Sequence, residues 1–256
     1  MERAIILAAG KGERLVNGKP HPKPLEKVNG VPLIVRVLRS LEQAGVDEVA
    51  IVVGYLGDVL KAGLAEYRFG LTLRFYDNDE YDKPNGTSLL KAAEFVQGPT
   101  YLLMSDHLWS QDLISAVRRY PLAVDEAVLG IDFNIAACFD LDDATKVSVR
   151  GDRIAAIHKE LPSYEALDTG VFRITPAVID ALRRADGPQG CSLSDGIGTL
   201  AAEGRMRVVD VEQAVWVDVD TPETHAHAES LLRRYGSALR PHADVAVTYA
   251  APPAAE

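Results

Sequence analysis

The segment Ala4-Ile-Ile-Leu-Ala-Ala-Gly10-Lys-Gly12-Glu-Arg14-Leu15 decides the fold class. It begins with a continuous apolar run, which is typical of a strand buried on both faces of a sheet. Two glycines follow, and because they lack side chains, their backbone N–H groups can approach a phosphate closely. Arg14 adds a planar fork that suits phosphate oxygens. The segment therefore predicts a first strand followed by an anion-binding loop, with an ordinary glycine turn as the alternative.

Two better-known phosphate-binding motifs do not fit this loop. A P-loop needs four residues between its first glycine and a Gly-Lys-Ser/Thr triplet, whereas five residues separate Gly12 from Gly18, and Pro20 follows Lys19. A dinucleotide-binding fingerprint needs a third glycine three residues after the second, where this chain has Leu15. The loop therefore belongs to neither of these classes.

Strand-like and helix-like segments alternate after this loop. Strand-like runs occur at 49–53, 71–76 and 100–104, and helix-like segments occur at 32–44, 58–67 and 87–96. This β-α-β-α order predicts an α/β fold with a Rossmann-like, doubly wound, mostly parallel sheet.

The second half of the chain changes character and predicts a small inserted β region. Short alternating runs at 146–150 and 153–158 are joined by Gly151-Asp152, which is a hairpin signal. Further strands are expected at 127–132, 169–174, 206–211 and 214–217, and helices at 176–184, 193–203 and 222–235. The last residues, 236–256, contain several prolines and alanines, and we expect a flexible tail there.

Composition excludes several classes of function. The 256 residues include 27 Lys and Arg against 37 Asp and Glu, so the formal net charge is −10. This balance argues against general binding to nucleic acids or anionic membranes. Cys138 and Cys191 have no zinc-site spacing, so we expect free thiols and a cytoplasmic protein. The apolar runs are strand-sized, and we expect no signal segment and no membrane insertion.

Carboxylates follow two of the predicted strands. Asp106 comes directly after the run 100–104, and ligands bind at the carboxyl ends of strands in open α/β sheets. Mg²⁺ prefers one or two such carboxylates, although Asp106 could also simply cap a helix. Asp218 and Asp220 are two residues apart, so on a strand they would share one face and suit a divalent cation.

Two further stretches could bind parts of a nucleotide. Lys23 ends the stiff segment Lys19-Pro-His-Pro-Lys23 and is a candidate charge partner for a polyphosphate, although a solvated basic loop is an equal alternative. Gly86 lies in Asn85-Gly-Thr-Ser88 at the start of a predicted helix, where it would allow the close approach of a flat base. A simple helix start is the alternative.

Taken together, these motifs resemble a known family. LAAGKGERL at 7–15 followed by PKPLEKVNGVPLI at 22–34 is similar to the opening of the nucleotidyltransferases that make nucleotide-sugars and CDP-alcohols. Their pattern is L-x-x-G-x-G-x-R-[LM] followed by P-K-x-L. The Ser-Asp-His form around Asp106, with an aromatic residue two positions after His107, resembles the branch that transfers CMP to inositol 1-phosphate. The chain departs from the pattern at Glu13, where Thr or Ser is usual, and in its proline-rich spacer.

The resemblance covers about residues 2–235 and implies roles for individual residues. It implies a GT-A-like nucleotidyltransferase domain at 1–235, with a nucleotide-binding half at about 1–125 and an acceptor-binding half at about 126–235. The nucleotide would contact Leu7, Ala8, Ala9, Gly10, Gly12, Arg14 and Lys23, with its base near Asn85, Gly86 and Ser88. Asp106 and Asp220 would hold Mg²⁺. The acceptor would contact Lys159 through its phosphate and Lys146, Asp168, Thr169 and Gly170 through the rest of the molecule.

The expected reaction is a Mg²⁺-dependent transfer of CMP from CTP to a phosphorylated alcohol. With inositol 1-phosphate as acceptor, the products would be CDP-inositol and pyrophosphate. A phosphate monoester is already ionised near pH 7, so the reaction needs no general base. Three alternatives stay open: another acceptor such as phosphocholine, a phosphonate or a sugar or cyclitol phosphate; another nucleotide; or a non-catalytic nucleotide-binding regulator. The role of His107, in substrate contact or in structure, stays open, as does the choice between a monomer and a homodimer.

Overall fold

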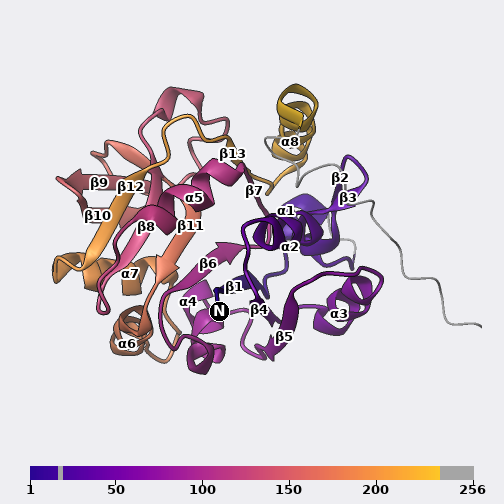
Figure 1. Cartoon of the computed structure of the whole chain (residues 1–256), viewed down its shortest axis with the longest axis horizontal. Helices are drawn as coiled ribbons and strands as arrows, with labels where there is room; N and C mark the ends of the chain where they lie inside the picture. The colour runs from indigo at the N-terminus through magenta and orange to yellow at the C-terminus, as the bar shows by residue number, and fades with distance from the viewer. Residues whose placement is uncertain (17–19, 237–256) are drawn as a thin grey trace, which may run out of the picture.

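The computed structural model describes residues 1–16 and 20–236. Within them, nine strands form one sheet in the order β5-β4-β1-β6-β11-β8-β12-β10-β9 (Figure 1). These strands are β1 (Arg3–Ala8), β4 (Glu48–Val53), β5 (Thr72–Asp77), β6 (Thr100–Met104), β8 (Ala127–Asp132), β9 (Lys146–Arg150), β10 (Arg153–His158), β11 (Ala166–Ile174) and β12 (Met206–Asp210). Two short pairs lie outside it: β2 (Lys27–Val28) with β3 (Val31–Pro32), and β7 (His107–Trp109) with β13 (Trp216–Asp218).

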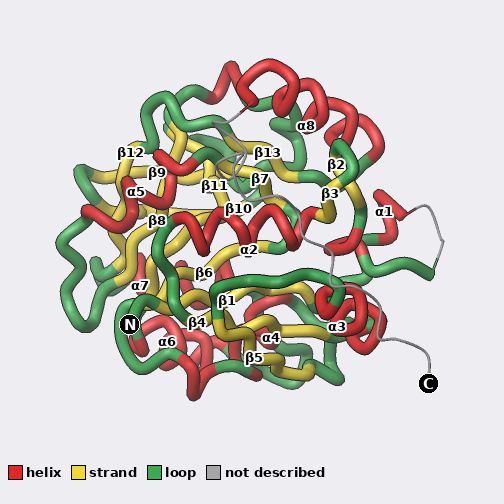
Figure 2. Tube along the Cα trace, turned by 45° about the vertical axis from the view of Figure 1, so that its right-hand side comes forward, coloured by secondary structure: helices red, strands yellow, loops and turns green. Residues whose placement is uncertain are grey.

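Helices cover both faces of this sheet, as the sequence predicted for a doubly wound fold (Figure 2). The helices are α1 (Glu13–Val16), α2 (Leu33–Gln43), α3 (Gly57–Ala65), α4 (Asn85–Lys91), α5 (Gln111–Arg119), α6 (Pro176–Ala185), α7 (Leu193–Ala202) and α8 (Pro222–Tyr235). One hydrophobic cluster packs α2, α3 and α5 against one face, and a second packs α4, α6 and α7 against the other. In residues 1–16 and 20–236, no helix is both long and apolar enough to cross a lipid bilayer.

The first half of the sheet is parallel and follows directly from the apolar runs. β1 lies between β4 and β6, where Ile5 is paired with Ala50 on one side and Leu102 on the other. All three side chains are fully buried, because both faces of these strands are covered by helices. The predicted helix at 87–96 is shorter than expected: α4 ends at Lys91, and a single turn, η2 (Ala93–Phe95), follows.

The second half makes the sheet mixed rather than mostly parallel. β11 runs antiparallel to β6 on one side and to β8 on the other, and it thereby joins the two halves. Its pairing with β8 shifts between Asp168 and Phe172, and Gly170 within this irregularity has a φ of +74°. The predicted hairpin at Gly151-Asp152 is confirmed, since β9 and β10 pair antiparallel around it.

The last described helix stands apart from the main sheet and closes one side of the molecule. α8 packs on β2 and β13 through a small cluster that includes Val28, Val217 and Leu232 (Figure 1). Its first turn is capped by Thr221, whose hydroxyl accepts the backbone N–H of Thr224. The flexible tail expected at 236–256 lies outside the described residues from 237 onward, as does Lys19 of the basic loop.

Candidate active site

Two adjoining cavities lie at the carboxyl ends of β1 and β6. One has a volume of about 590 Å³ and is lined by the glycine loop after β1. The other, of about 450 Å³, extends over β8, β11 and the start of α7 toward α8. Asp106, Asp220 and Asn85 line both cavities. A molecule in each cavity would therefore meet its neighbour beside these two carboxylates.

The first cavity collects most of the residues that the sequence assigned to a nucleotide. Its lining includes Leu7, Ala8, Ala9, Gly10, Gly12, Arg14, Lys23, Asn85 and Ser88. Gly12 has a φ of +62°, and a Cβ there would lie 2.4 Å from Cβ of Lys23. Only glycine at position 12 leaves room for Lys23 to pack against the loop. From this position the ammonium group of Lys23 reaches the carboxylates of Asp106 and Asp220.

Gly86 does not lie where the sequence suggested. It is absent from the lining of both cavities, and a Cβ at this position would lie 2.6 Å from the backbone oxygen of Cys191. Asn85 beside it accepts the backbone N–H of Leu193 through Oδ1, at 2.8 Å. The glycine is therefore explained by the tight contact of α4 with the start of α7, rather than by the approach of a base.

Ser88 presents a defined hydrogen-bonding group to the first cavity. Asn78 is buried, and its Oδ1 accepts the backbone N–H of Glu80 at 2.9 Å, which fixes the orientation of the amide. Its Nδ2 must then donate to Oγ of Ser88, also at 2.9 Å. The Ser88 hydroxyl lines the cavity and, with its oxygen accepting from Asn78, keeps its own proton and a second lone pair for a further partner.

Lys23 is buried between the two predicted metal ligands. Its Nζ donates to Oδ2 of Asp106 at 2.7 Å and also contacts Oδ1 of Asp220. Burial alone would lower the pKa of Lys23, but the carboxylates of Asp106, Asp218 and Asp220 outweigh it and raise that pKa above its usual value. The structure thus brings together three predicted residues that are far apart in the sequence.

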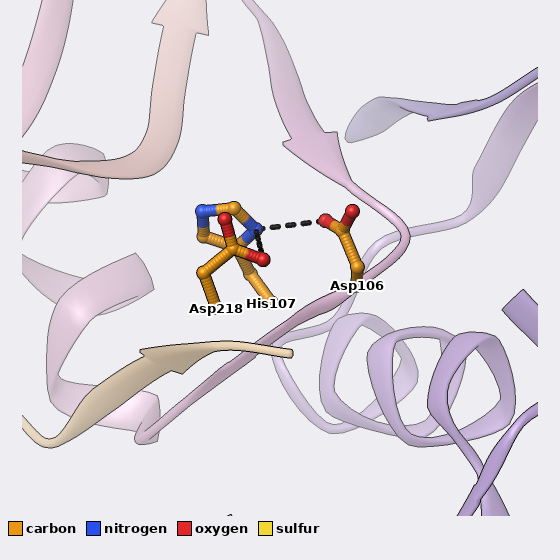
Figure 3. A group of neighbouring side chains, drawn as sticks. All are labelled: Asp106, His107 and Asp218. Carbon is orange, nitrogen blue, oxygen red and sulfur yellow. Dashed lines mark hydrogen bonds and ion pairs between the residues drawn. The ribbon is translucent and has the colours of Figure 1, made fainter. Parts of the chain in front are cut away.

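His107 joins Asp106 to Asp218 (Figure 3). Its Nδ1 lies 2.9 Å from Oδ1 of Asp106 and 3.8 Å from Oδ1 of Asp218. Burial would lower the pKa of His107, yet these two carboxylates raise it to about 9, so the ring is charged at neutral pH. The ring also packs on Gly170, where a Cβ would lie 2.5 Å from its Cδ2. His107 therefore has a structural role that the sequence left open.

The carboxylate cluster is suited to a divalent cation. Oδ1 of Asp218 is buried and has no hydrogen-bond partner among the residues that the structure describes. Burial, with the charges of Asp106 and Asp220, raises the pKa of Asp218 to about 8 in spite of His107 and Lys23. Three carboxylates thus converge here, and oxygen ligands of this kind are those that Mg²⁺ prefers. The donor set fits the predicted ion.

Asp143 is a site residue that the sequence did not single out. Its Oδ2 accepts from Arg14 at 3.1 Å, and its Oδ1 accepts from Lys159 at 2.6 Å. Burial would raise the pKa of Asp143, but Lys159 and Arg14 lower it to about 2. Arg14 also lies 2.9 Å from Oδ2 of Asp220. Two of the predicted phosphate-binding cations therefore meet at a single carboxylate.

The second cavity contains only part of the predicted acceptor set. Asp168, Gly170 and Lys159 line it. Thr169 is fully buried, and its hydroxyl donates to the backbone oxygen of Gly130 at 2.7 Å. Lys146 is also buried and donates to the backbone oxygen of Asp142 at 3.0 Å. These two contacts hold strands and loops together, so the structure does not place Thr169 or Lys146 at the acceptor.

Comparisons with known proteins agree with this arrangement. Residues 4–129 match the model of the MobA-like NTP transferase domain. The chain is 35% identical over 231 residues to a bifunctional IPC transferase and DIPP synthase of Rubrobacter xylanophilus, covering 90% of this chain and 51% of the relative. A protein of the same name from Thermococcus kodakarensis is 33% identical over 234 residues, covering 91% and 51%. The chain thus spans about half the length of these curated relatives.

A solved structure extends the agreement to the whole described fold. The inositol-1-phosphate CTP transferase of T. maritima superposes with a TM-score of 0.81 at 25% sequence identity, covering 91% of this chain and 96% of that one. A 2-aminoethylphosphonate cytidylyltransferase of Lancefieldella rimae is 35% identical over 150 residues, covering 56% of this chain and 58% of the relative. With the glycine loop, Lys23 and the carboxylate cluster in place, the chain belongs to the nucleotidyltransferase family.

Proposed function

We propose that this protein transfers CMP from CTP to a phosphorylated alcohol in a Mg²⁺-dependent reaction, with inositol 1-phosphate as the acceptor. The observation that carries the proposal is that Asp106 and Asp220 line both cavities. A triphosphate on the glycine loop and a phosphate monoester in the second cavity would meet beside these carboxylates. The names of the similar proteins support CMP as the transferred group and inositol 1-phosphate as the acceptor.

The chemistry is limited by electrostatic repulsion, since a dianionic acceptor must approach a triphosphate. An oxygen of the acceptor phosphate attacks the α-phosphorus in line, a new P–O bond forms, and the bond to pyrophosphate breaks. Arg14 and Lys23 are placed to offset charge on the leaving pyrophosphate, and Lys159 to offset charge on the acceptor. Mg²⁺ held by Asp106 and Asp220, with Asp218 beside them, would supply further charge neutralisation at the phosphates.

Ser88 is the side chain that we assign to contact with the cytosine base. Cytosine has acceptors at both O2 and N3, whereas N3 of uracil carries a proton. The Ser88 hydroxyl, whose oxygen accepts from Asn78, can donate to N3 of cytosine, whereas N3 of uracil offers no acceptor and only O2 and O4 could accept from it. We therefore expect Ser88→Ala to reduce the preference for CTP over UTP.

The lining of the second cavity supports a polyhydroxy acceptor. Asp132, Asn134, Thr145 and Asp168 line it and offer oxygen acceptors, which suit the hydroxyls of a cyclitol. Apolar side chains that line the same cavity include Ile157, Leu193 and Ile197, which can contact the ring carbons.

The test is a screen of pyrophosphate release with four NTPs against inositol 1-phosphate, phosphocholine, 2-aminoethylphosphonate and glucose 1-phosphate. We expect the highest kcat/KM with CTP and inositol 1-phosphate. Pyrophosphate release should be lost in Asp106→Asn and after chelation of Mg²⁺. A higher value with another pair would assign the protein to a sister activity. Tight CTP binding without release for any acceptor would refute the proposal and favour a non-catalytic regulator.

A further inference from the structure

Asp132 is the last residue of β8, and its side chain is buried at the wall of the second cavity. Both carboxylate oxygens accept from neutral donors. Oδ1 accepts the backbone N–H of Asn134 at 2.7 Å, in a turn typical of aspartate, and Oδ2 accepts the indole N–H of Trp216 at 2.8 Å. Asp132 forms no ion pair with the residues that the structure describes. Its carboxylate therefore has a fixed orientation beside the cavity, and no cation neutralises it.

Trp216 is placed by the short strand pair that also leads to the two predicted metal ligands. In β13 it pairs with Trp109 of β7, and β7 begins directly after Asp106. β13 in turn leads to Asp220. The indole thus links the carboxylate of Asp132, in the acceptor half, to the strand pair at the metal site. The separation between Asp132 and the metal ligands is therefore held by paired strands.

The carboxylate of Asp132 suits a hydroxyl group of a ligand. An ionised carboxylate has about four lone-pair sites, and the two hydrogen bonds within the chain use two of them. It can only accept, so it recognises a hydroxyl by the proton that the hydroxyl donates, in a hydrogen bond about twice as strong as one between neutral groups. A ligand with no hydroxyl at this point would displace water from the carboxylate and give no hydrogen bond in return.

We propose that Asp132 is a specificity-determining residue that binds one hydroxyl on the body of the acceptor, and that Trp216 is a positioning residue that holds the carboxylate for this contact. The inference deepens the proposed function and rests on it for the identity of the acceptor as a phosphorylated polyalcohol. Because paired strands hold Asp132 at a fixed separation from the metal ligands, the site would select acceptors by the position of this hydroxyl relative to the phosphate.

The test compares two phosphate monoesters that differ only in their ring hydroxyls. Inositol 1-phosphate carries free hydroxyls on its ring, and cyclohexyl phosphate carries none. Each is titrated into the full chain in a calorimeter, with Mg²⁺ and without CTP, so that no turnover occurs. We expect Asp132→Asn to weaken the binding of inositol 1-phosphate by about tenfold and that of cyclohexyl phosphate by less than about twofold. Asp142→Asn, which removes the same charge from an exposed position, should change both affinities by less than about twofold.

A double variant tests the positioning role of Trp216. Trp216→Phe removes the indole N–H and keeps an aromatic ring, and we expect it to weaken the binding of inositol 1-phosphate by about threefold to tenfold. Adding Trp216→Phe to Asp132→Asn should cause no further loss, because both changes act through one carboxylate. Additive losses would overturn the positioning role. Urea unfolding shows whether each variant is folded, and Asp132→Ser provides a second substitution.

Three results would overturn the hydroxyl contact. The first is an equal change for the two monoesters in Asp132→Asn, which is a general charge effect. The second is a larger loss for phosphocholine than for inositol 1-phosphate, because the carboxylate would then bind a cation. The third is no binding of inositol 1-phosphate by the unmodified chain. Binding that depends on Asp132, without pyrophosphate release from CTP, would support the contact and refute the proposed function, so the two can fail separately.

Discussion

The ionisation of Asp168 provides a quantitative test of the described site. Asp168 lies at the irregular pairing of β11, where its Oδ1 accepts the backbone N–H of Gly170 at 2.7 Å. Burial raises the pKa of Asp168 from 3.8 to about 6, although Gly170 and His107 act in the opposite direction. In Asp168→Asn, the side-chain oxygen can still accept the backbone N–H of Gly170, but the side chain no longer ionises. We therefore expect the variant to become more stable, relative to the unmodified chain, as the pH rises.

The sign follows from proton linkage. Because the pKa is higher in the folded chain, the unfolded chain loses this proton first as the pH rises through 4 to 6. The stabilisation from a protonated Asp168 is present below about pH 4 and is lost as the pH rises through about 6. A pKa shift of about two units corresponds to a change of about 3 kcal/mol in the free energy of unfolding. About two thirds of this change falls between pH 4.5 and 7.5. Water in the cavity screens part of this, so we expect about 1–2 kcal/mol.

The assay is urea unfolding at pH 4.5 and 7.5 with EDTA, in which the free energy of unfolding of Asp168→Asn is compared with that of the unmodified chain at each pH. Asp58→Asn, at a fully exposed position, controls for the loss of one negative charge. His107 stays charged over this range, since its pKa is about 9. A difference between variant and unmodified chain that is constant, or that falls with pH, would refute the argument.

Other predictions address the chemistry and the packing. Asp106→Asn should abolish CTP turnover while leaving the far-UV circular dichroism spectrum unchanged; turnover near the normal kcat would remove Asp106 from the metal site. Arg14→Ala should lower kcat/KM for the nucleotide by about 10²-fold in steady-state kinetics. Gly86→Ala should lower the free energy of unfolding by about 1–3 kcal/mol, because its Cβ would contact the backbone of Cys191, whereas Gly98→Ala, with open space around it, should change it by less than about 1 kcal/mol. Equal effects of the two glycine substitutions in urea unfolding would contradict the packing argument.

Much of the fold could be predicted because its signals are local. Continuous apolar runs gave β1, β4 and β6, and the Gly151-Asp152 turn gave the β9–β10 hairpin. The direction of β11 could not be predicted, because it depends on where the chain inserts between β6 and β8. α5 was missed although Leu113, Ile114 and Val117 form a buried stripe with helical spacing. That signal was present in the sequence, beside the more prominent motif around Asp106.

Site residues could be predicted where the end of a strand positions them. They could not be predicted where the direction of a side chain or the path of a loop decides their position. Asp106 follows β6 of the main sheet, and Asp220 follows β13, which pairs antiparallel with β7 and thereby returns to Asp106, where Val219 donates its backbone N–H to the backbone oxygen of Asp106. Alternation along a strand means that Asp168 and Thr169 face opposite sides, so they could not both contact the acceptor; this signal was available. Asp143 had no such signal, since only the path of residues 133–145 brings it to Arg14 and Lys159.

The position of β11 has a consequence for how such an enzyme changes during evolution. Since this strand is hydrogen-bonded to β6 on one side and to β8 on the other, the distance between the two substrates is set when the chain folds. Substitutions in the strands would disturb both sites at once. Apart from Asp143, which also contacts Arg14, the lining residues of 133–145, the segment that connects β8 to β9, belong to the second cavity and not to the first. A new acceptor is therefore expected to arise through this connecting segment, while the geometry of phosphoryl transfer is inherited unchanged.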